Sequence, residues 1–563
     1  MSRRTGRKYK LAAWGLAVTL ALGTGSLAEA AQSLNQPGQD IKGQLPQPQA
    51  EVHDETPAKP QGAPEVHFTI TNFRLEAPEL ELDHGDLTKI LQDGMGEGRT
   101  MRDLNETINQ LTRYCRQHGY PAAAAYVPAQ ESSDGMVTLR IIPGRYGAVK
   151  IENHSKLKER VAQGFLNGLK ADDIIRTGQL ETTLYSISDV SGTRAVGVLR
   201  PGQKFGTSDL TVRIEEGKGE NTVLYVENYG SKNTGRYRYG LQENLYDIGG
   251  TGSRASVGTL LSNDHMHDYY ANYEMLIGHG GTSLGVGFSR MDYQVGGQLS
   301  NLDANGIAYT YSLFGSRPLY HLTNSQMKLL YGYDYRDLKD DIDRFHYSSK
   351  KHSNSVHAGL AGYERRPGFG LSYTGMVTTG TVGLDSDYAR MQYGQGDTDV
   401  EGRYTKASFD ATATQRLGHR TDVMVKASGQ IASNNLDGSE EMYLGGASGI
   451  RAYPQGTGSG DVGIMGTTEF RYYTDLPGLV LSTYFDYGHV RYNKSHALDR
   501  LRPGAGQLSS GMTLAGWGLG LSYTKPDDWF ARLDYARRIG SDANLSEDAR
   551  AHNRVWFLMG KNW

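Results

Sequence analysis

Alternation of apolar and polar positions dominates the second half of the chain. From about residue 222 to the C-terminus helical periodicity is absent, and sixteen amphipathic stretches follow one another. Each is apolar at every second residue, as in strands that bury one face. An even number of such strands is typical of a transmembrane β-barrel of the outer-membrane type. The stretches are 222–230, 237–246, 252–263, 269–278, 282–297, 306–319, 325–340, 350–365, 370–384, 403–416, 421–434, 463–474, 479–493, 513–525, 528–540 and 552–563.

The connections between these stretches favour the same interpretation. Short connections such as 247–250 and 417–420 alternate with longer ones such as 385–402, 435–462 and 494–512. Outer-membrane barrels have short periplasmic turns and longer outer loops. A soluble β-sandwich would explain neither the number of strands nor this alternation. We therefore predict a 16-stranded barrel over 222–563, with the long loop 435–462 facing outward.

Residues from about 65 to 218 combine helical and strand patterns. The first half predicts a strand at 66–70, helices near 86–93 and over 101–118, and strands at 124–127 and 137–142. The same order returns with a strand at 148–151, helices over 155–168 and 178–190, and strands at 195–199 and 210–214. A repeated unit of this size predicts two small α+β domains, 65–144 and 145–218.

The N-terminal residues have the order of an export signal. Several Arg and Lys residues precede an apolar run over 11–23, and the small residues Ala28 and Ala30 follow. This arrangement predicts a secretory signal peptide over 1–30, cleaved after Ala30. Residues 31–64 are rich in Pro and Gln, without apolar periodicity. They are interpreted as a flexible linker, or as a short plug element ahead of a linker.

Composition excludes several classes of protein. The 563-residue chain has a formal net charge of −3, without the basic excess that nucleic-acid binding requires. Its single cysteine, Cys115, cannot form an intrachain disulfide or a Cys-based metal cluster. After residue 23 no apolar run approaches the ~20 residues of a spanning helix. The 72 glycines and 36 tyrosines remain compatible with a membrane barrel.

Three motifs suggest enzyme or metal chemistry, but their context argues against it. Residues 281–285 fit a nucleophile elbow, yet a glycine-rich strand follows the serine where that motif needs a helix. Residues 458–463 fit G-x-G-x-x-G, but precede a strand. Residues 264–268 offer two Asp and two His side chains on a short outer connection, where a solvated tip is the simpler interpretation. We therefore expect no enzyme activity, no cofactor and no metal.

The repeated unit resembles a polypeptide-transport-associated (POTRA) domain. In the first unit the similar residues are Tyr114, Gly119-Tyr120, Tyr126 to Gln130, Asp134-Gly135 and Val137 to Leu139. In the second they are Asn153 to Leu157, Leu199 to Gly202 and Gly206 to Leu210. Both units are similar to the POTRA domains of two-partner secretion transporters of the hemolysin-activator type.

The long loop carries a second resemblance. Gly449-Ile450-Arg451-Ala452-Tyr453 resembles the Val-Arg-Gly-Tyr tip of the sixth outer loop in the superfamily of POTRA-bearing insertases and transporters. The resemblance implies that the loop folds into the barrel and that Arg451 contacts an acidic residue of the wall. Tyr484 to Gly488 resembles the matching strand motif, with Asp486 and Gly488 facing inward. Glu469 and Arg471 on the preceding strand are also predicted to face inward. Together with Arg451, Tyr453, Asp486 and Gly488 they are the candidate lock between loop and lumen.

The last strand places aromatic residues on its outer face. Val555, Phe557, Met559, Lys561 and Trp563 alternate, which suits the aromatic girdle of a barrel. In outer-membrane barrels such a terminal aromatic residue is also read by the assembly machinery. Phe557 and Trp563 are therefore the candidate barrel-assembly signal, although phenylalanine would be usual in the last position.

The resemblance as a whole implies an outer-membrane pore of a Gram-negative bacterium with its POTRA domains in the periplasm. Such a pore exports, and in some cases activates, one large hemolysin or filamentous adhesin, whose unfolded chain the POTRA domains bind. Other expected partners are outer-membrane lipid, the barrel-assembly machinery and periplasmic chaperones, but no nucleic acid. Two alternatives stay open, which are a barrel-assembly insertase of the same superfamily and a passive porin or uptake channel.

Overall fold

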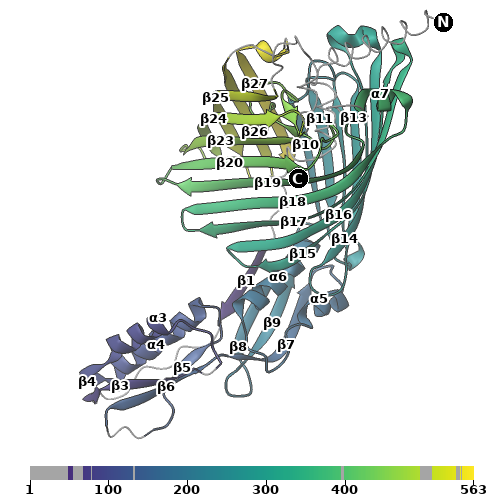
Figure 1. The fold of residues 1–563 in the computed structure, drawn as a ribbon. Coiled ribbons are helices and arrows are strands. Elements are labelled where there is room, and N and C mark those ends of the chain that lie inside the picture. The colour runs from purple at the N-terminus through teal and green to yellow at the C-terminus, as the bar shows by residue number, and fades with distance from the viewer. Residues whose placement is uncertain are drawn as a thin grey trace, which may run out of the picture.

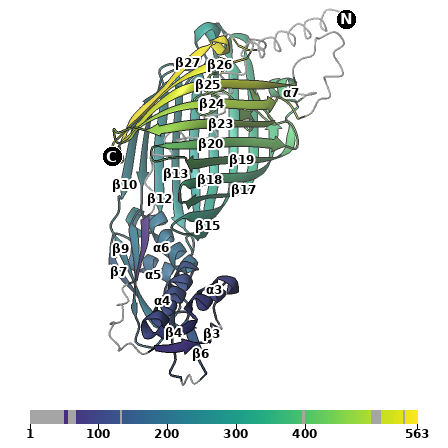
Figure 2. The same ribbon diagram turned by 90° about the vertical axis from the view of Figure 1, so that its left-hand side faces the viewer.

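The computed structural model describes residues 49–54, 67–77, 79–130, 134–394, 399–494, 510–540, 545–546 and 548–563. Two small α/β domains lie one after the other at one end of a large barrel (Figures 1 and 2). The predicted signal peptide, with Ala28 and Ala30, and most of the linker lie outside the described residues. Among the helices that the structure describes, none is long and apolar enough to cross a membrane.

The first small domain contains the predicted helices and more strands than predicted. Its elements are β2 (His67–Ile70), β3 (Asn72–Glu76), α3 (His84–Gly94), β4 (Gly96–Thr100), α4 (Met101–Gln117), β5 (Ala124–Tyr126) and β6 (Met136–Ile142). The strands form a sheet of order β3-β6-β5 and a separate pair β2-β4. The helices and the three-stranded sheet enclose one apolar core that includes Leu111, Cys115 and Leu139.

The start of α4 follows from its sequence. Thr100 caps the helix by accepting a hydrogen bond from the backbone of Asp103, whose carboxylate accepts one from Thr100 in return. This capping box satisfies donors that a helix otherwise leaves free. The apolar face then buries Leu104, Leu111 and Cys115, whereas Met101 in the first turn is exposed.

The second small domain repeats the unit and has a simpler sheet. Its elements are β7 (Arg145–His154), α5 (Glu159–Leu166), α6 (Thr177–Ser191), β8 (Arg194–Pro201) and β9 (Thr207–Glu215). Both helices pack on the sheet and enclose a second apolar core, which includes Tyr146, Leu184 and Val212.

A strand from the predicted linker completes this second sheet. β1 (Gln49–Asp54) pairs in parallel with β8, so the sheet order is β1-β8-β9-β7. The interpretation of all of 31–64 as linker or plug is therefore wrong for these six residues. Of the side chains described in this strand, Ala50 and Val52 pack against the core, and so short a segment shows no pattern in the sequence. Glu51 adds a salt bridge of 2.5 Å to Arg194 on β8.

The predicted number of sixteen barrel strands is confirmed. They form one closed antiparallel ring, and the last strand pairs with the first. The strands are β10 (Glu220–Glu227), β11 (Arg238–Leu245), β12 (Arg254–Ser262), β13 (Met266–Leu276), β14 (Ser283–Gln294), β15 (Ala304–His321), β16 (Ser325–Ile342), β17 (Tyr347–Arg366), β18 (Phe369–Leu384), β19 (Gly402–Arg416), β20 (Thr421–Ala432), β23 (Val462–Tyr473), β24 (Leu479–Arg491), β25 (Gly511–Thr524), β26 (Trp529–Ile539) and β27 (Asn553–Asn562).

Burial along the strands shows which face meets which environment. On β24, Phe485 and Tyr487 are exposed on the outside, whereas Tyr484 and Asp486 between them are buried inside. The exposed positions of the other strands are likewise rich in apolar and aromatic residues. Lipid-facing apolar residues with a polar interior are the pattern of a transmembrane barrel.

The second small domain is fixed against the barrel turns nearest to it. Helix α6 packs along β15 and its turn, as both ribbon views show. His321 is buried there, with Nδ1 3.0 Å from the carboxylate of Asp189 and its ring stacked on Tyr185 at 4.1 Å. Thr182 accepts a hydrogen bond from the His321 backbone at 3.0 Å. This junction joins the domain to the barrel through side chains of both.

Candidate functional site

The sixth outer connection, residues 433–461, folds back into the barrel as predicted. Two short strands within it, β21 (Met442–Tyr443) and β22 (Ser459–Gly460), pair with each other. Its tip, Ile450 to Tyr453, is buried against residues of β24, β25 and β26 in a cluster that includes Tyr484 and Leu514. The tip is therefore packed into the barrel wall.

Backbone contacts within the loop shape this tip. The amide of Ile450 donates to the carbonyl of Leu444 at 2.7 Å, and the amide of Tyr453 donates to Ile450 at 3.1 Å. A Cβ at Gly449 would lie 2.1 Å from the Leu444 carbonyl oxygen, so only glycine fits this crossing. The resulting tight turn directs the side chain of Arg451 toward the wall.

Arg451 is buried and bound by three carboxylates. Its Nε and Nη2 donate to the two oxygens of Asp486 at 3.0 and 2.8 Å, a bidentate pair. Its Nη1 donates to Glu469 at 3.1 Å and to Asp534 at 3.3 Å. The guanidinium also lies 3.1 Å from the ring centroid of Tyr484. The predicted contact between Arg451 and Asp486 is thus present, and two further carboxylates share the charge.

Hydrogen bonds fix the backbone around Arg451 in addition to its side chain. Its amide donates to Asp486 at 3.1 Å, and its carbonyl accepts a hydrogen bond of 2.6 Å from the indole of Trp556 on β27. The hydroxyl of Tyr453 donates to the carbonyl of Ile539 at 3.1 Å. These contacts reach β24, β26 and β27, so the tip bridges much of this wall. We call the set around Arg451 the tip lock.

Two glycines of the wall make room for the tip. A Cβ at Gly488 would lie 2.8 Å from the side chain of Leu444 and 3.2 Å from that of Ile450. A Cβ at Gly516 on β25 would lie 2.5 Å from the Cβ of Ala452. Ala452 stands where related tips have glycine, and the bare backbone of Gly516 accommodates its methyl group. Gly488, the glycine of the strand motif, therefore allows the loop to pack closely against the wall.

Most of the predicted site residues meet, and one does not. Arg451, Tyr453, Glu469, Asp486 and Gly488 lie together in the tip lock, as described above. Arg471 was predicted to join them and instead makes a separate pair.

Arg471 donates to the carboxylate of Asp422 on β20 at 2.7 and 3.1 Å. It shares a face with Glu469 but lies one step nearer the small domains, opposite Asp422 in the strand register. The alternation of inward-facing and outward-facing residues does not tell how far along the barrel axis Glu469 and Arg471 each lie. The inclusion of Arg471 in the lock is therefore wrong.

The sequence interpretation missed three members of the lock. Asp534 and Arg532 on β26 and Trp556 on β27 were not identified. Arg532 donates to Asp534 at 2.6 and 3.0 Å and to Glu469 at 3.3 Å, so a second cation offsets part of the charge of the three acids. Alternation places Arg532 and Asp534 on the inward face of β26, but it does not place them at the depth of Arg451.

Charges at this depth need such partners. Glu469, Asp486 and Asp534 are all nearly inaccessible to solvent, and Arg451 is 4% exposed. A buried charge without a partner is strongly destabilising, whereas a paired and hydrogen-bonded one is tolerated. The network therefore favours one position of the loop and makes alternative positions costly.

The candidate assembly signal lies at the outer face of the last strand. Trp563 is exposed, and Lys561 lies 5.1 Å from its ring and 5.5 Å from that of Trp529. Phe557 lies 6.2 Å from Tyr237, ring to ring, beside the first connection of the barrel. This arrangement gives Lys561 aromatic partners near the membrane boundary, but its role in assembly stays a prediction.

The motifs set aside above lie in the barrel strands and their connections. The segment after Gly281 is the strand β14. Among the described residues no three His, Cys, Asp or Glu side chains are grouped so as to hold a metal ion. Cys115 is fully buried, and burial raises the pKa of its thiol to about 11.

Comparison with protein families identifies relatives along most of the chain. The family model described as haemolysin secretion/activation protein ShlB/FhaC/HecB matches residues 206–523, and that of the ShlB-type POTRA domain matches residues 68–144. The heme/hemopexin transporter protein HuxB of Haemophilus influenzae is 26% identical over 494 residues, covering 87% of this chain and 86% of its own. The outer membrane transporter CdiB of Dickeya dadantii is 21% identical over 456 residues, covering 76% and 77%.

Solved structures show the same fold. CdiB from Escherichia coli aligns with a TM-score of 0.66 and 18% identity, covering 90% of this chain and 93% of its own. CdiB from Acinetobacter baumannii aligns with a TM-score of 0.64 and 17% identity, covering 94% and 97%. BamA from Haemophilus ducreyi, lacking its POTRA domains 1–3, gives 0.52 at 13% identity, covering 88% and 100%.

Proposed function

This chain belongs to the haemolysin secretion/activation protein family, and we propose that it exports a hemolysin- or adhesin-type exoprotein that its POTRA domains bind in an unfolded state. It is an outer-membrane transporter of two-partner secretion, with its POTRA domains in the periplasm and a large secreted exoprotein as its partner. The observation that carries this function is the family match, which spans the end of the second POTRA domain and most of the barrel.

The edges of the first POTRA sheet support binding of an extended passenger segment. The order β3-β6-β5 leaves β3 and β5 at the two edges of that sheet. An extended peptide can add a strand to such an edge through main-chain hydrogen bonds. In the second POTRA domain the edge of β8 already carries β1 of the chain itself. We therefore place passenger binding on the first domain.

A second passenger class follows from the relatives. HuxB, which matches over most of both chains, carries the name heme/hemopexin transporter protein. An exoprotein that binds heme or a heme carrier is therefore a candidate beside a hemolysin or filamentous adhesin. We propose further that the barrel reaches the membrane through periplasmic chaperones and the barrel-assembly machinery, which would read Phe557 and Trp563, and that it catalyses no reaction.

Secretion together with conductance tests this function against its alternatives. Cells would express the transporter with a candidate exoprotein, such as the product of a large neighbouring gene, and exoprotein in the medium would be normalised to barrel in the outer membrane. We expect export that depends on the transporter. Steady conductance without export would favour a porin, and loss of other outer-membrane barrels on deletion would favour an insertase.

Binding stoichiometry tests where the passenger docks. A fragment of residues 49–218 retains β1, and a fragment of residues 65–218 lacks it. We expect the N-terminal segment of the exoprotein to bind the longer fragment once. If neither fragment binds the segment, the docking proposal is wrong. A second binding site that is present only in the fragment without β1 would show that the β8 edge can also bind the segment.

A further inference from the structure

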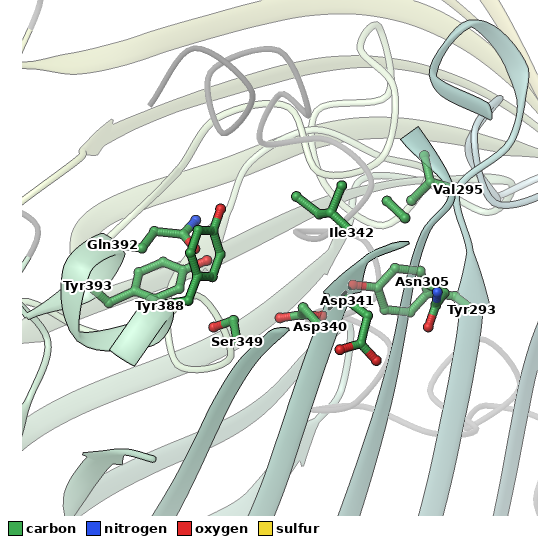
Figure 3. A pocket seen from close by; sticks show the side chains of 11 residues that line it. Tyr293, Val295, Asn305, Asp340, Asp341, Ile342, Ser349, Tyr388, Gln392 and Tyr393 are labelled. Atoms are coloured by element: carbon green, nitrogen blue, oxygen red, sulfur yellow. Dashed lines mark hydrogen bonds between the residues drawn. The ribbon is translucent and has the colours of Figure 1, made fainter. Parts of the chain in front are cut away.

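A small cavity lies at the outer end of the barrel, between the wall and helix α7 (Asp387–Tyr393), far from the POTRA domains (Figure 1). The outer ends of β14, β15, β16 and β17 enclose it. It offers about 30 Å³ to the centres of water-sized groups, which is room for about two waters or one small ligand group. Figure 3 shows Tyr388 and Tyr393 of α7 on one side, and Tyr293 and Asn305 on the other. We call this space the α7 cavity.

A buried hydroxyl group without a partner lines the α7 cavity. Ser349 on β17 is 2% exposed, and its Oγ has no hydrogen-bond partner among the described residues. Buried hydroxyl groups are normally hydrogen-bonded, because burial without a partner costs free energy. The Ser349 hydroxyl is therefore available to a polar group placed in the cavity.

A carboxylate lies directly opposite this hydroxyl. Asp340 on β16 pairs with Ser349 in the strand register, so their side chains share one face of the sheet. The hydroxyl of Tyr293 donates to Oδ1 of Asp340 at 2.6 Å. Within the described part of the chain, Oδ2 of Asp340 accepts no hydrogen bond and the carboxylate makes no ion pair. The ionised form of a buried carboxylate needs such a partner.

The neighbouring acids already have cations of their own. Asp341, which also lines the cavity, pairs with Lys339 at 2.5 Å. Asp437 pairs with Lys351 on β17 at 2.5 Å. Because these two cations are each offset by another carboxylate, the negative charge of Asp340 is left over at the cavity.

The lining of the α7 cavity favours an organic cation over a metal ion. Apolar side chains and tyrosine rings make up much of it, including Ile342, Tyr388 and Tyr393. A hard metal ion such as Ca²⁺ takes about six to eight oxygen ligands. The described residues contain no group of three His, Cys, Asp or Glu side chains that could hold a metal. An ammonium group, in contrast, binds favourably against the face of an aromatic ring.

The protein itself places an ammonium group beside one of these rings. The Nζ of Lys351 lies 4.3 Å from the ring centroid of Tyr393. The ring of Tyr388 is fixed in turn by stacking on Tyr347, with 4.6 Å between the ring centroids. The aromatic side of the cavity is therefore ordered and suited to a cation.

We propose that the α7 cavity binds the ammonium group of a small primary alkylamine from the outer solution. Its N–H groups donate to Oδ2 of Asp340 and to Oγ of Ser349, and the rings of Tyr388 and Tyr393 face its charge. Its short alkyl chain lies against Val295 and Ile342. The ligand thereby connects α7 with β16 and β17 through contacts that the chain alone does not make.

Binding of n-propylammonium to the purified full-length transporter in detergent tests this proposal. Saturation-transfer difference NMR at constant ionic strength measures the affinity. We expect saturable binding to the wild-type protein. Binding of n-propanol, which has the same chain without the charge, should be at least about tenfold weaker, because charge-assisted hydrogen bonds are lost. Tetramethylammonium should also bind at least about tenfold more weakly, because it has no N–H group to donate.

Three variants assign the binding to this cavity. Asp340→Asn should weaken n-propylammonium binding at least about tenfold, and Ser349→Ala at least about threefold. Ser349→Ala should leave the unfolding temperature of the barrel unchanged, because the hydroxyl has no partner to lose. Asp385→Asn is the matched control and should bind as the wild type does. It removes an acid from the same end of the barrel, paired with His352 at 2.7 Å, that does not line the cavity.

The measurements can contradict the proposal in three ways. The proposal is overturned if the wild-type protein shows no saturable binding, or if Asp340→Asn and Asp385→Asn bind equally well. It is also overturned if potassium ions displace n-propylammonium at equal concentration, which would indicate a general cation site. Ser349→Ala keeps the test decisive if Asp340→Asn assembles poorly. Because no exoprotein is present, the result is independent of the secretion test.

Discussion

Charged residues are used in opposite ways in the barrel and in the two POTRA domains. Inside the barrel, ion pairs such as Arg451 with Asp486 are almost inaccessible to solvent. In the POTRA domains, pairs such as Arg140 with Glu76 and Arg113 with Glu106 are partly to largely exposed. The POTRA domains bury apolar cores instead.

The difference reflects what each region must hold. A POTRA domain is closed on itself and gains stability from removing apolar surface from water. The barrel presents its apolar surface to lipid, so its interior is polar and cannot hold a loop by apolar burial alone. Paired charges fix the loop there, because an alternative position leaves a buried charge unpaired. Ion pairs should therefore matter inside the barrel and hardly at all in the POTRA domains.

Loss of Arg451 should give the largest effect. Arg451→Ala leaves three buried carboxylates with one cation fewer, a loss of about 3–5 kcal/mol where the pair is dry and less in a wet lumen. We expect an inserted barrel whose secretion falls at least about tenfold, since the loop no longer holds one position. The measurement is exoprotein in the medium, normalised to barrel in the outer membrane.

Companion variants sharpen this result. Arg451→Lys should restore secretion only in part, because an ammonium cannot make the bidentate contact. Asp486→Ala should resemble Arg451→Ala, and the double variant should be no worse than either. Wild-type secretion by Arg451→Ala would show that the arginine has no part in holding the loop.

The second-largest effect is expected when a buried apolar side chain of the first POTRA domain is shortened. This prediction tests the apolar half of the comparison between barrel and POTRA domains. Leu139 is fully buried in the core of that domain. Leu139→Ala should destabilise it by about 2–5 kcal/mol, through lost apolar burial and the cavity left behind. Urea unfolding of the fragment 65–218 measures this effect. An unchanged midpoint would mean that the apolar core does not determine the stability of the domain.

The sequence was sufficient where a pattern is repeated or a motif is local. Alternation over sixteen stretches predicted the barrel strands to within a few residues. The tip motif and the strand motif predicted the contact between Arg451 and Asp486. Both signals are carried by neighbouring positions, so they need no knowledge of how distant strands align.

Other features depend on strand register and on short backbone pairings. Asp534 and Trp556 reach Arg451 because β26 and β27 pair at one particular offset, which alternation does not specify. Arg471 was misassigned for the same reason. β4 contains Gly96 and Gly98, and among the described side chains of β1 two pack on the core. Neither sequence therefore predicts a strand without knowledge of its partner strand.

The junction between the two regions should show an intermediate effect. Asp189→Asn removes the carboxylate that contacts buried His321, a hydrogen bond worth about 1 kcal/mol. We expect the second POTRA domain to move more freely against the barrel while both parts stay folded. Spin labels on introduced cysteines at the exposed residues Lys204 and His419 would report a broader distance distribution. Cys115 need not be removed, because its thiol is buried and its pKa is raised to about 11. An unchanged distribution would mean that the other contacts of the junction, such as the stacking on Tyr185 and the hydrogen bond to Thr182, hold it without this carboxylate.

The smallest effect is expected for an exposed pair of the first POTRA domain. Arg140 donates to Glu76 at 2.6 Å across β6 and β3, with side chains that are 49% and 39% exposed. Water solvates both groups when they separate, and ordering two long side chains offsets the weak attraction. Arg140→Gln should leave the urea midpoint of the fragment 65–218 within experimental error, at low and at high salt. Arg140 donates from Nε and Nη2 to one oxygen of Glu76, whereas Arg451 meets both oxygens of Asp486 and is buried, so both burial and geometry distinguish the two pairs. A loss of stability similar to that of Leu139→Ala would show that surface charges stabilise the POTRA domain and would remove the contrast with the barrel.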